Sequence, residues 1–188
     1  MQMITPHVTN GVNVDDLVST INAVKQEPEL AKFQFNISNC WIGGGHNRST
    51  VNGFRGAMQD MEHKTTFRMD AGEPAVLLGN DEGANPVEYF LHALAACVTS
   101  SMVYHAAGQG IEIEAVESTL QGEIDLRGFL GIDSNVRNGY EKIRISMRIK
   151  TKADERQWSR LVRLGPTFSP VYDSVTKGVP VEISAERM

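Results

Sequence analysis

Two cysteines carry the most nucleophilic side chains of this sequence, and Cys97 is the stronger candidate for chemistry. At about 100° per residue, the face of the predicted helix around Cys97 includes Phe90, Leu94, Ser101 and Tyr104. A thiol reacts as its thiolate, which apolar surroundings disfavour and a nearby cation favours. On periodicity alone, Cys97 is best interpreted as a small buried apolar residue, the usual role of a free cysteine.

Cys40 and the histidines are weaker candidates. Cys40 lies far from Cys97 in the sequence, without CxxC spacing, so we expect neither a disulfide framework nor a resolving role for it. His92 and His105 share one predicted helix but are not an i, i+4 pair, and the other histidines also lack metal-ligand spacing. Phosphate-binding, dinucleotide-binding and nucleophile-elbow motifs are missing from the sequence. We therefore expect no metal and no cofactor.

The helix that positions Cys97 has the clearest start signal in the chain. In Asn85-Pro86-Val87-Glu88, Asn85 is the predicted N-cap, Pro86 takes the first helical position and Glu88 the third, as in a capping box. The helix should end at Gly108 or Gly110. Because charge is sparse after Glu88, we expect the helix to be buried in a core, in a subunit interface, or in both.

Further helices and strands are predicted before and after this helix in the sequence. Apolar residues at helical spacing predict helices, and apolar residues at every second position predict strands. Their order, with strands before and after the buried helix, is typical of an α+β domain. The first 13 residues should be loose, and the loop 127–139 should fold against a neighbour because it carries Phe129, Leu130 and Ile132. The predicted helices are 14–27, 85–108, 154–164 and 169–177, the predicted strands are 33–41, 49–54, 64–69, 116–126, 143–149 and 179–183, and 71–84 is a predicted loop.

Composition narrows the class of protein. The chain has 188 residues, 41% of them hydrophobic and 22% charged, which suits a single globular domain, 33–188, preceded by an N-terminal segment, 1–32, with an amphipathic helix. The net charge of −5 argues against nucleic-acid and anionic-membrane partners. Residues 1–14 lack the apolar core of a signal peptide, and the apolar stretches look too short to cross a bilayer. Two unpaired cysteines fit a reducing cytoplasm.

Several segments together resemble the OsmC-like family, which includes the organic hydroperoxide resistance proteins. The run GANPVEYFLHALAACVTSSMVYHAAGQGIEI resembles the family's central helix, in which an Asn-Pro start leads to a helix-borne cysteine. FNISNCWIGG, EPAVLLG, TLQGEIDLRGFLGI and FSPVYDSVTKGVPVEI resemble other family segments in the same order. The resemblance implies two sheets around a buried central helix and an intertwined homodimer.

The resemblance also implies peroxiredoxin-like chemistry with departures in this chain. In the family, the helix cysteine attacks a hydroperoxide and becomes a sulfenic acid, which a second cysteine in a Cys-Pro start resolves. Ser169 occupies that second place here, so two-cysteine turnover should be missing and Ser169 should be a helix N-cap. Where the hydroperoxide-resistance branch has a glutamate that supports an active-site arginine, this chain has Val87.

Cys97, Arg48 and Glu88 are therefore the candidate catalytic residues. Cys97 would be the nucleophile, and Arg48 would polarise the peroxide, with Arg55 and Arg68 as rivals for that role. Glu88 is interpreted first as a cap. We expect a homodimer that reduces organic hydroperoxides with an external thiol as reductant, in response to oxidative stress. The alternative is a non-catalytic relative that binds a small apolar or oxidised ligand at the dimer interface.

Overall fold

The computed structural model describes residues 7–188, which divide into two compact units. One, here called the sheet unit, is Asn13–Phe90. The other, the core unit, comprises Leu91–Met188 and the described part of Met1–Val12. Both units contain helices and strands, so the predicted α+β class is confirmed. The boundary between the two units falls within the central helix, between Phe90 and Leu91.

The sheet unit consists of a helix and a four-stranded antiparallel sheet. Asn13 caps helix α1 (Val14–Gln26) by accepting from the amides of Asp15 and Asp16. Strand β5 lies at the centre of the sheet, with β3 and β4 on one side and β6 on the other. The glycine turn between β4 and β5 aligns Cys40 with Arg48, and β6 aligns Asp70 with Arg48. The strands are β3 (Gln34–Phe35), β4 (Ser38–Gly43), β5 (His46–Gly56) and β6 (Gln59–Ala71), and short 3₁₀ helices cover Pro28–Ala31 and Ala75–Leu77.

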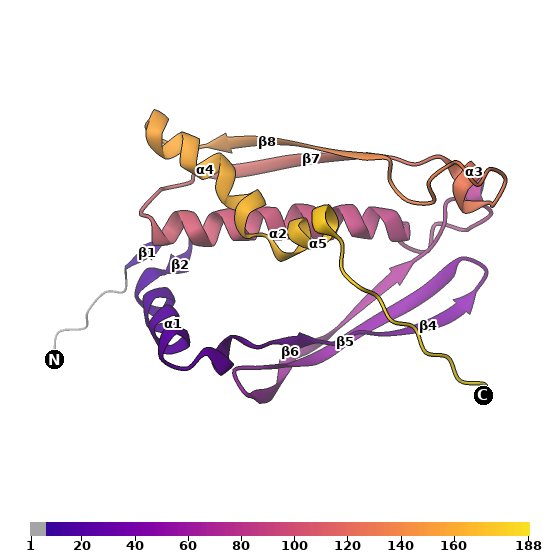
Figure 1. Cartoon of the computed structure of the whole chain (residues 1–188), viewed down its shortest axis with the longest axis horizontal. Helices are drawn as coiled ribbons and strands as arrows, with labels where there is room; N and C mark the ends of the chain where they lie inside the picture. The colour runs from indigo at the N-terminus through magenta and orange to yellow at the C-terminus, as the bar shows by residue number, and fades with distance from the viewer. Residues whose placement is uncertain (1–6) are drawn as a thin grey trace. The chain divides into compact units, whose positions relative to one another are not determined.

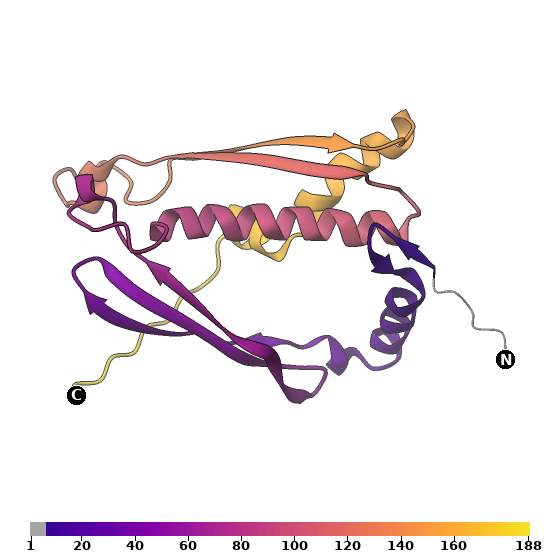
Figure 2. The ribbon, with the colours of Figure 1, turned by 180° about the vertical axis from the view of Figure 1, so that it is seen from behind.

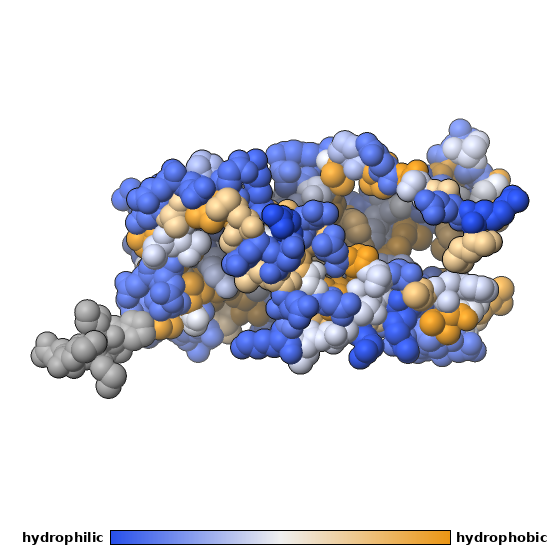
Figure 3. Space-filling model, turned by 90° about the horizontal axis from the view of Figure 1, so that it is seen from below, coloured by the Kyte–Doolittle hydropathy of each residue, from blue (hydrophilic) through white to orange (hydrophobic). Residues whose placement is uncertain are grey.

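A row of aromatic rings runs over this sheet. Neighbouring ring centroids lie between 5.2 and 6.2 Å apart, within the range of favourable aromatic pairs. Most of these rings face solvent, and Phe35 is 75% exposed. The space-filling view shows apolar side chains reaching the surface among polar ones (Figure 3). The row consists of Phe33, Phe35, Phe54, His63 and Phe67.

The core unit packs helices against a two-stranded sheet. The hairpin β7 (Ala115–Glu123) and β8 (Lys142–Lys150) runs alongside helix α2 (Pro86–Gly108), and helix α4 (Glu155–Phe168) crosses that helix (Figures 1 and 2). Two short helices, α3 (Leu126–Phe129) and α5 (Pro170–Lys177), complete this unit. The inner residues of β7 and β8 alternate with charged residues, so Arg148 and Lys150 face solvent.

The hydrophobic core lies where α2, α4 and the hairpin meet. Its buried members are Met102, Ala106, Ile111, Leu161 and Leu164. Helix α4 approaches α2 closely at Gly165, where a Cβ atom would lie 2.8 Å from Cγ1 of Val98 and 2.9 Å from its carbonyl oxygen. Only a glycine fits this crossing, which fixes α4 beside the residue that follows Cys97.

Several sequence-based expectations about elements were wrong. The predicted strand 33–41 is split into β3 and β4 at residues 36–37. Helix α4 continues past Leu164 through Gly165 and Pro166 to Phe168. The predicted strand 179–183 has no strand partner within residues 7–188, although its apolar residues alternate; Ile183 is 90% exposed. A strand needs a neighbour, and this chain alone supplies none to that segment.

The N-terminal residues are better ordered than expected. Strands β1 (Val8–Thr9) and β2 (Val12–Asn13) form a small hairpin whose turn holds Asn10 and Gly11 at positive φ. Asn10 donates to the carbonyl of Ile111 at 2.9 Å and accepts from the amide of Ile113 at 2.8 Å. These bonds hold the hairpin to the segment after α2, so the expected looseness is wrong for residues 8–13. Residues 1–6 lie outside the described range.

Helix α2 also corrects the expectation that every apolar stretch is too short for a bilayer. Its 23 residues are long and apolar enough to span one by length and composition. Core helices of globular proteins meet the same criterion, and α2 buries Leu94, Val98 and Met102. Its early residue Phe90 and late residue Tyr104 are 41% and 54% exposed. Thus one face of α2 is covered within the chain and part of the rest is open.

The close crossing at Gly165 gives a stability prediction. Gly165→Val should lower the free energy of unfolding by about 1–3 kcal/mol, because added methyl groups would overlap Val98. Gly43→Val is the matched control, since a Cβ at Gly43 meets open space within the described chain, and should change it by no more than about 0.5 kcal/mol. Urea unfolding followed by far-ultraviolet circular dichroism measures both. Equal effects of the two substitutions would show that the crossing is not tight.

Candidate functional site

Cys97 is a free, half-buried thiol on the middle of α2. The next residue, Val98, is buried against Gly165 of α4. Ser101 lies one helical turn beyond Cys97 on the same face and donates to the carbonyl of Phe168 at 3.4 Å. The Phe168 ring stacks on His105, a further turn along, with ring centroids 3.7 Å apart. The junction between α4 and α5 therefore follows the same face of α2 that carries Cys97.

Ser169 occupies this junction directly after Phe168. Its side chain is 1% exposed and accepts from the amide of Tyr172 at 3.1 Å, so the predicted role as N-cap of α5 is confirmed. The contacts of Val98 and Ser101 with Gly165 and Phe168 bring the backbone before Ser169 to within about one turn of the Cys97 position on α2. A hydroxyl in this place cannot form a disulfide with an oxidised thiol.

His105 is the titratable group nearest to this junction along α2. Partial burial lowers the pKa of its imidazole, so the ring is neutral at physiological pH. Its position two helical turns from Cys97 corresponds to about 12 Å along the helix axis. His105 is therefore a stacking partner of Phe168 and is too distant to take a proton from the Cys97 thiol.

Glu88 acts as a helix cap. Its carboxylate accepts from the amide of Asn85 at 2.8 Å, and Oδ1 of Asn85 accepts from the amide of Val87 at 2.9 Å. The first bond is the Glu88 half of the predicted capping box, whereas the Asn85 side chain caps the amide of the second helical residue rather than that of the third. Asn85 also donates to the carboxylate of Glu73, which ties the helix start to the loop before it. Glu88 is thus engaged with the backbone and does not bind Arg48.

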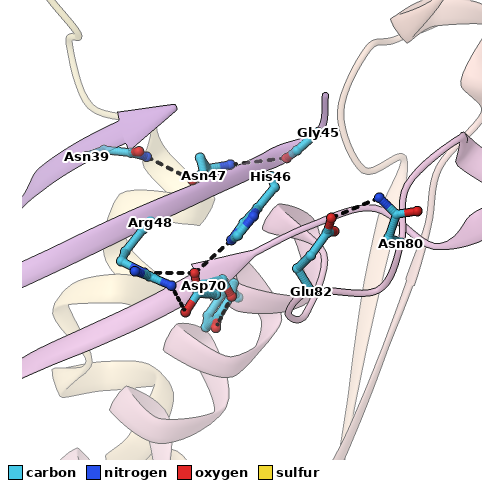
Figure 4. Close-up of polar contacts among 9 residues, drawn as sticks. Asn39, Gly45, His46, Asn47, Arg48, Asp70, Asn80 and Glu82 are labelled. Atoms are coloured by element: carbon cyan, nitrogen blue, oxygen red, sulfur yellow. Dashed lines mark hydrogen bonds and ion pairs between the residues drawn. The ribbon is translucent and has the colours of Figure 1, made fainter. Parts of the chain in front are cut away.

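Arg48 binds Asp70, a residue that the sequence analysis did not select. Nε of Arg48 donates to Oδ1 of Asp70 at 2.9 Å, and Nη2 donates to Oδ2 at 3.3 Å. Nε2 of His46 lies 2.7 Å from the same Oδ1 atom. Figure 4 shows Arg48 and His46 pointing towards Asp70 from the neighbouring strand. The hydrogen bond from His46, followed by that from Arg48, lowers the pKa of the Asp70 carboxyl, so Asp70 is ionised at neutral pH.

The backbone of Asp70 is fixed as firmly as its side chain. The hydroxyl of Tyr89 donates to the carbonyl of Asp70 at 2.8 Å. A Cβ at Gly83 would lie only 1.9 Å from the same carbonyl oxygen, so the loop before α2 fits against Asp70 only because this residue is a glycine. The start of α2 and the preceding loop therefore determine where Asp70 holds Arg48.

Arg55, one of the two other candidates for the role of Arg48, forms an ion pair with a carboxylate. Nη1 of Arg55 donates to Oδ1 of Asp60 at 3.1 Å, and both side chains are largely exposed. Arg68 pairs through the strand register with Thr50, next to the Arg48–Asp70 row. Arg48 is the arginine with a two-point carboxylate contact and a histidine beside it. Cys97 belongs to the core unit, whereas Arg48 and Glu88 belong to the sheet unit.

Asp70 and His46 had no sequence signal that would have singled them out. Both lie on strands, and their meeting depends on the register of β5 and β6, which pairs Arg48 with Asp70 across 21 intervening residues. Across residues 7–188, three or more His, Cys, Asp or Glu side chains nowhere gather closely enough to hold a metal ion. The candidate groups are thus a thiol in the core unit and, separately, a guanidinium–carboxylate pair in the sheet unit.

Comparisons with known proteins agree with this architecture. A family model described as OsmC-like protein matches residues 79–184, which is more than half of the chain. A search of functionally curated proteins found no match. Among solved structures, an OsmC-like protein from Mycoplasma pneumoniae has a TM-score of 0.57 at 13% identity, covering 76% of this chain and 87% of its own.

Two further solved structures share the fold at similarly low identity. One, from Psychrobacter arcticus, is named for osmotic stress induction and a detoxification response; its TM-score is 0.55 at 12% identity, with 73% of this chain and 85% of that chain covered. A hypothetical protein from Aquifex aeolicus has a TM-score of 0.52 at 16% identity, with 76% and 87% covered. Together with the family match over α2, β7, β8, α4 and α5, these likenesses confirm the resemblance: the chain belongs to the OsmC-like family.

Proposed function

We propose that this protein reduces organic hydroperoxides with Cys97 as its single redox-active thiol and with an external thiol as reductant. The observation that carries the proposal is the place of Cys97, a free and half-buried thiol on the central helix of an OsmC-like chain. A half-buried thiol remains open to a small peroxide while its neighbours exclude most water. Arg48 is proposed as the cation that favours the Cys97 thiolate and polarises the peroxide.

The proposed reaction needs one protein thiol and two molecules of reductant. The Cys97 thiolate attacks one peroxide oxygen, the O–O bond breaks, and the alkoxide takes up a proton and leaves as the alcohol. Cys97 is then a sulfenic acid. A first external thiol converts it to a mixed disulfide and releases water, and a second external thiol restores Cys97 and leaves as the external disulfide.

The first test is intact-mass analysis after one equivalent of cumene hydroperoxide. We expect one added oxygen per chain, mapped to Cys97 by peptide analysis and trapped by a sulfenic-acid reagent. Cys97→Ser should abolish the adduct, whereas Cys40→Ser should retain it, because Cys40 is an exposed strand residue of the other unit. An unmodified Cys97 would favour the alternative, a non-catalytic protein that binds a small apolar or oxidised ligand.

The α4–α5 junction gives a second test. Ser169→Cys should restore two-cysteine turnover, because the residue begins helix α5, where the helix dipole helps a thiol to ionise. We expect a disulfide between positions 97 and 169 after peroxide treatment, and faster peroxide consumption with a dithiol reductant. Ser174→Cys is the control, since it adds a thiol to the exposed part of the same helix. If Ser169→Cys gives neither a disulfide nor added turnover, the junction does not reach Cys97.

We also propose that the functional form is a homodimer. Its support is the apolar surface that a single chain leaves uncovered: the aromatic row of the sheet unit, the loop residues Phe129 and Ile132, and the segment 179–183. Burying one such side chain contributes about 1.5–3 kcal/mol, so the total favours association. The alternating segment 179–183 could become the predicted strand only with a neighbouring strand.

Light scattering tests the assembly. We expect a dimer at micromolar concentration, weakened by Val181→Glu, which places a charge on the apolar side of the segment 179–183. Ser184→Glu adds the same charge on its other side and should leave the dimer intact. A folded monomer of the unaltered protein at this concentration would contradict the proposal.

A further inference from the structure

Helix α4 carries a row of three arginines on its outer side, here called the arginine row. Arg156, Arg160 and Arg163 follow one another at spacings of four and three residues. At ~100° per residue they fall within about 60° of one another around the helix axis. Gly165, which packs against α2, lies roughly opposite the row. All three arginines are exposed, so the row lies on the side of α4 that the core unit leaves to solvent.

The arginine row has no counter-charge within the described chain. Across residues 7–188, none of its members lies within ion-pair distance of a carboxylate. Asp154 is engaged as the N-cap of α4 and accepts from the amide of Gln157 at 2.7 Å, and Glu155 is adjacent to Arg156 and so faces another side of the helix. Like charges three and four residues apart destabilise a helix. Helix α4 thus keeps three mutually repelling charges that its own fold does not use.

The β7–β8 hairpin of the same unit shows the opposite arrangement. On the outer face of β8, Arg144 forms an ion pair with Glu123, and Arg148 forms one with Glu117, both across to β7. Cross-strand pairs of opposite charge stabilise a hairpin, so these cations contribute to the fold. The arginine row makes no such contribution, which indicates that its charge serves a contact outside the chain.

The residues of α4 favour a protein as the partner in that contact. A helix that binds a lipid surface inserts its apolar face, but Leu161 and Leu164 of α4 are buried in the core. The net charge of −5 opposes nucleic acid, and a row about 10 Å long reaches few phosphates. Trp158 and Val162, on the neighbouring side of α4, are 38% and 40% exposed. Arginine and tryptophan together are typical of surfaces where proteins bind one another.

We infer that the arginine row is a docking surface for an acidic segment of a partner protein. Each guanidinium can bind one carboxylate at two points, which gives the contact both charge complementarity and a fixed register. A helical segment with glutamates three and four residues apart matches the row, and an apolar side chain beside them reaches Val162. The inference is independent of the chemistry proposed for Cys97, and its test uses no peroxide.

The probe is a fluorescein-labelled helical peptide with glutamates three and four residues apart and leucines on the adjoining side. Its binding to the full-length protein is measured by fluorescence anisotropy at physiological ionic strength and again with added salt. We expect the unaltered protein to bind the peptide, and added salt to weaken the binding. The triple variant Arg156→Gln, Arg160→Gln, Arg163→Gln should bind about five- to fiftyfold more weakly, the combined effect of three exposed ion pairs.

Two further variants separate the row from net charge and from folding. The triple variant Lys142→Gln, Arg144→Gln, Arg148→Gln removes the same number of positive charges from the outer face of β8. Because salt screens distant charges, it should keep the affinity within about twofold. Arg160→Glu places opposite charges next to one another on α4, so it should unfold at an equal or higher urea concentration while it loses peptide binding.

Selective loss of binding in the variants of the arginine row, with Arg160→Glu still folded, supports the inference. Equal weakening in the two triple variants would show that only net charge attracts the peptide and would overturn it. Failure of the unaltered protein to bind the peptide at millimolar concentration would also overturn it. A single-stranded oligonucleotide or a phosphatidylserine vesicle that binds more tightly than the peptide, and only while the row is intact, would assign the row to a different partner and refute the inference.

Discussion

The crossing of α4 over α2 at Gly165 is the contact on which the core unit depends. Because Gly165 has no side chain, the backbone of α4 can approach Val98, and Leu161 and Leu164 enter the core with Met102 and Ala106. The same crossing continues into the hydrogen bond from Ser101 to Phe168 and the stacking of Phe168 on His105. One small residue thus positions the α4–α5 junction along the face of α2 that carries Cys97.

In the sheet unit, Asp70 is the residue at which several elements meet, as Gly165 is in the core unit. Its carbonyl receives the hydroxyl of Tyr89 and adjoins Gly83, while its carboxylate receives Arg48 and His46. The start of α2 and the central strand of the sheet are therefore linked through one residue. A guanidinium held at two points loses little further freedom when it binds a substrate oxygen, which suits a group that must be oriented in advance.

The distribution of apolar side chains is the observation behind the proposed homodimer. The described chain buries nine apolar residues as its core, but leaves aromatic and aliphatic side chains of the sheet unit, the β7–β8 loop and the C-terminal segment exposed to solvent. Monomeric proteins rarely expose large apolar patches, and the aromatic row of the sheet unit alone joins five neighbouring rings. One departure from the sequence-based expectations, the segment 179–183 without a strand partner in residues 7–188, lies among these exposed regions.

The local sequence was sufficient to predict the main helices and to place the Cys97 thiol on one of them. Asn85 and Ser169 were predicted as the caps of their helices because a cap depends on residues two or three positions apart. The apolar run of α2 identified the helix that carries Cys97. Segment order and the Asn-Pro start also sufficed to indicate the OsmC-like family. Only the tertiary structure could show that Asp70 rather than Glu88 binds Arg48, because strand register joins residues far apart in sequence. It likewise decided that α4 runs through Pro166 and that segment 179–183 has no strand partner among residues 7–188, since packing at Gly165 and the supply of a neighbouring strand are not local properties.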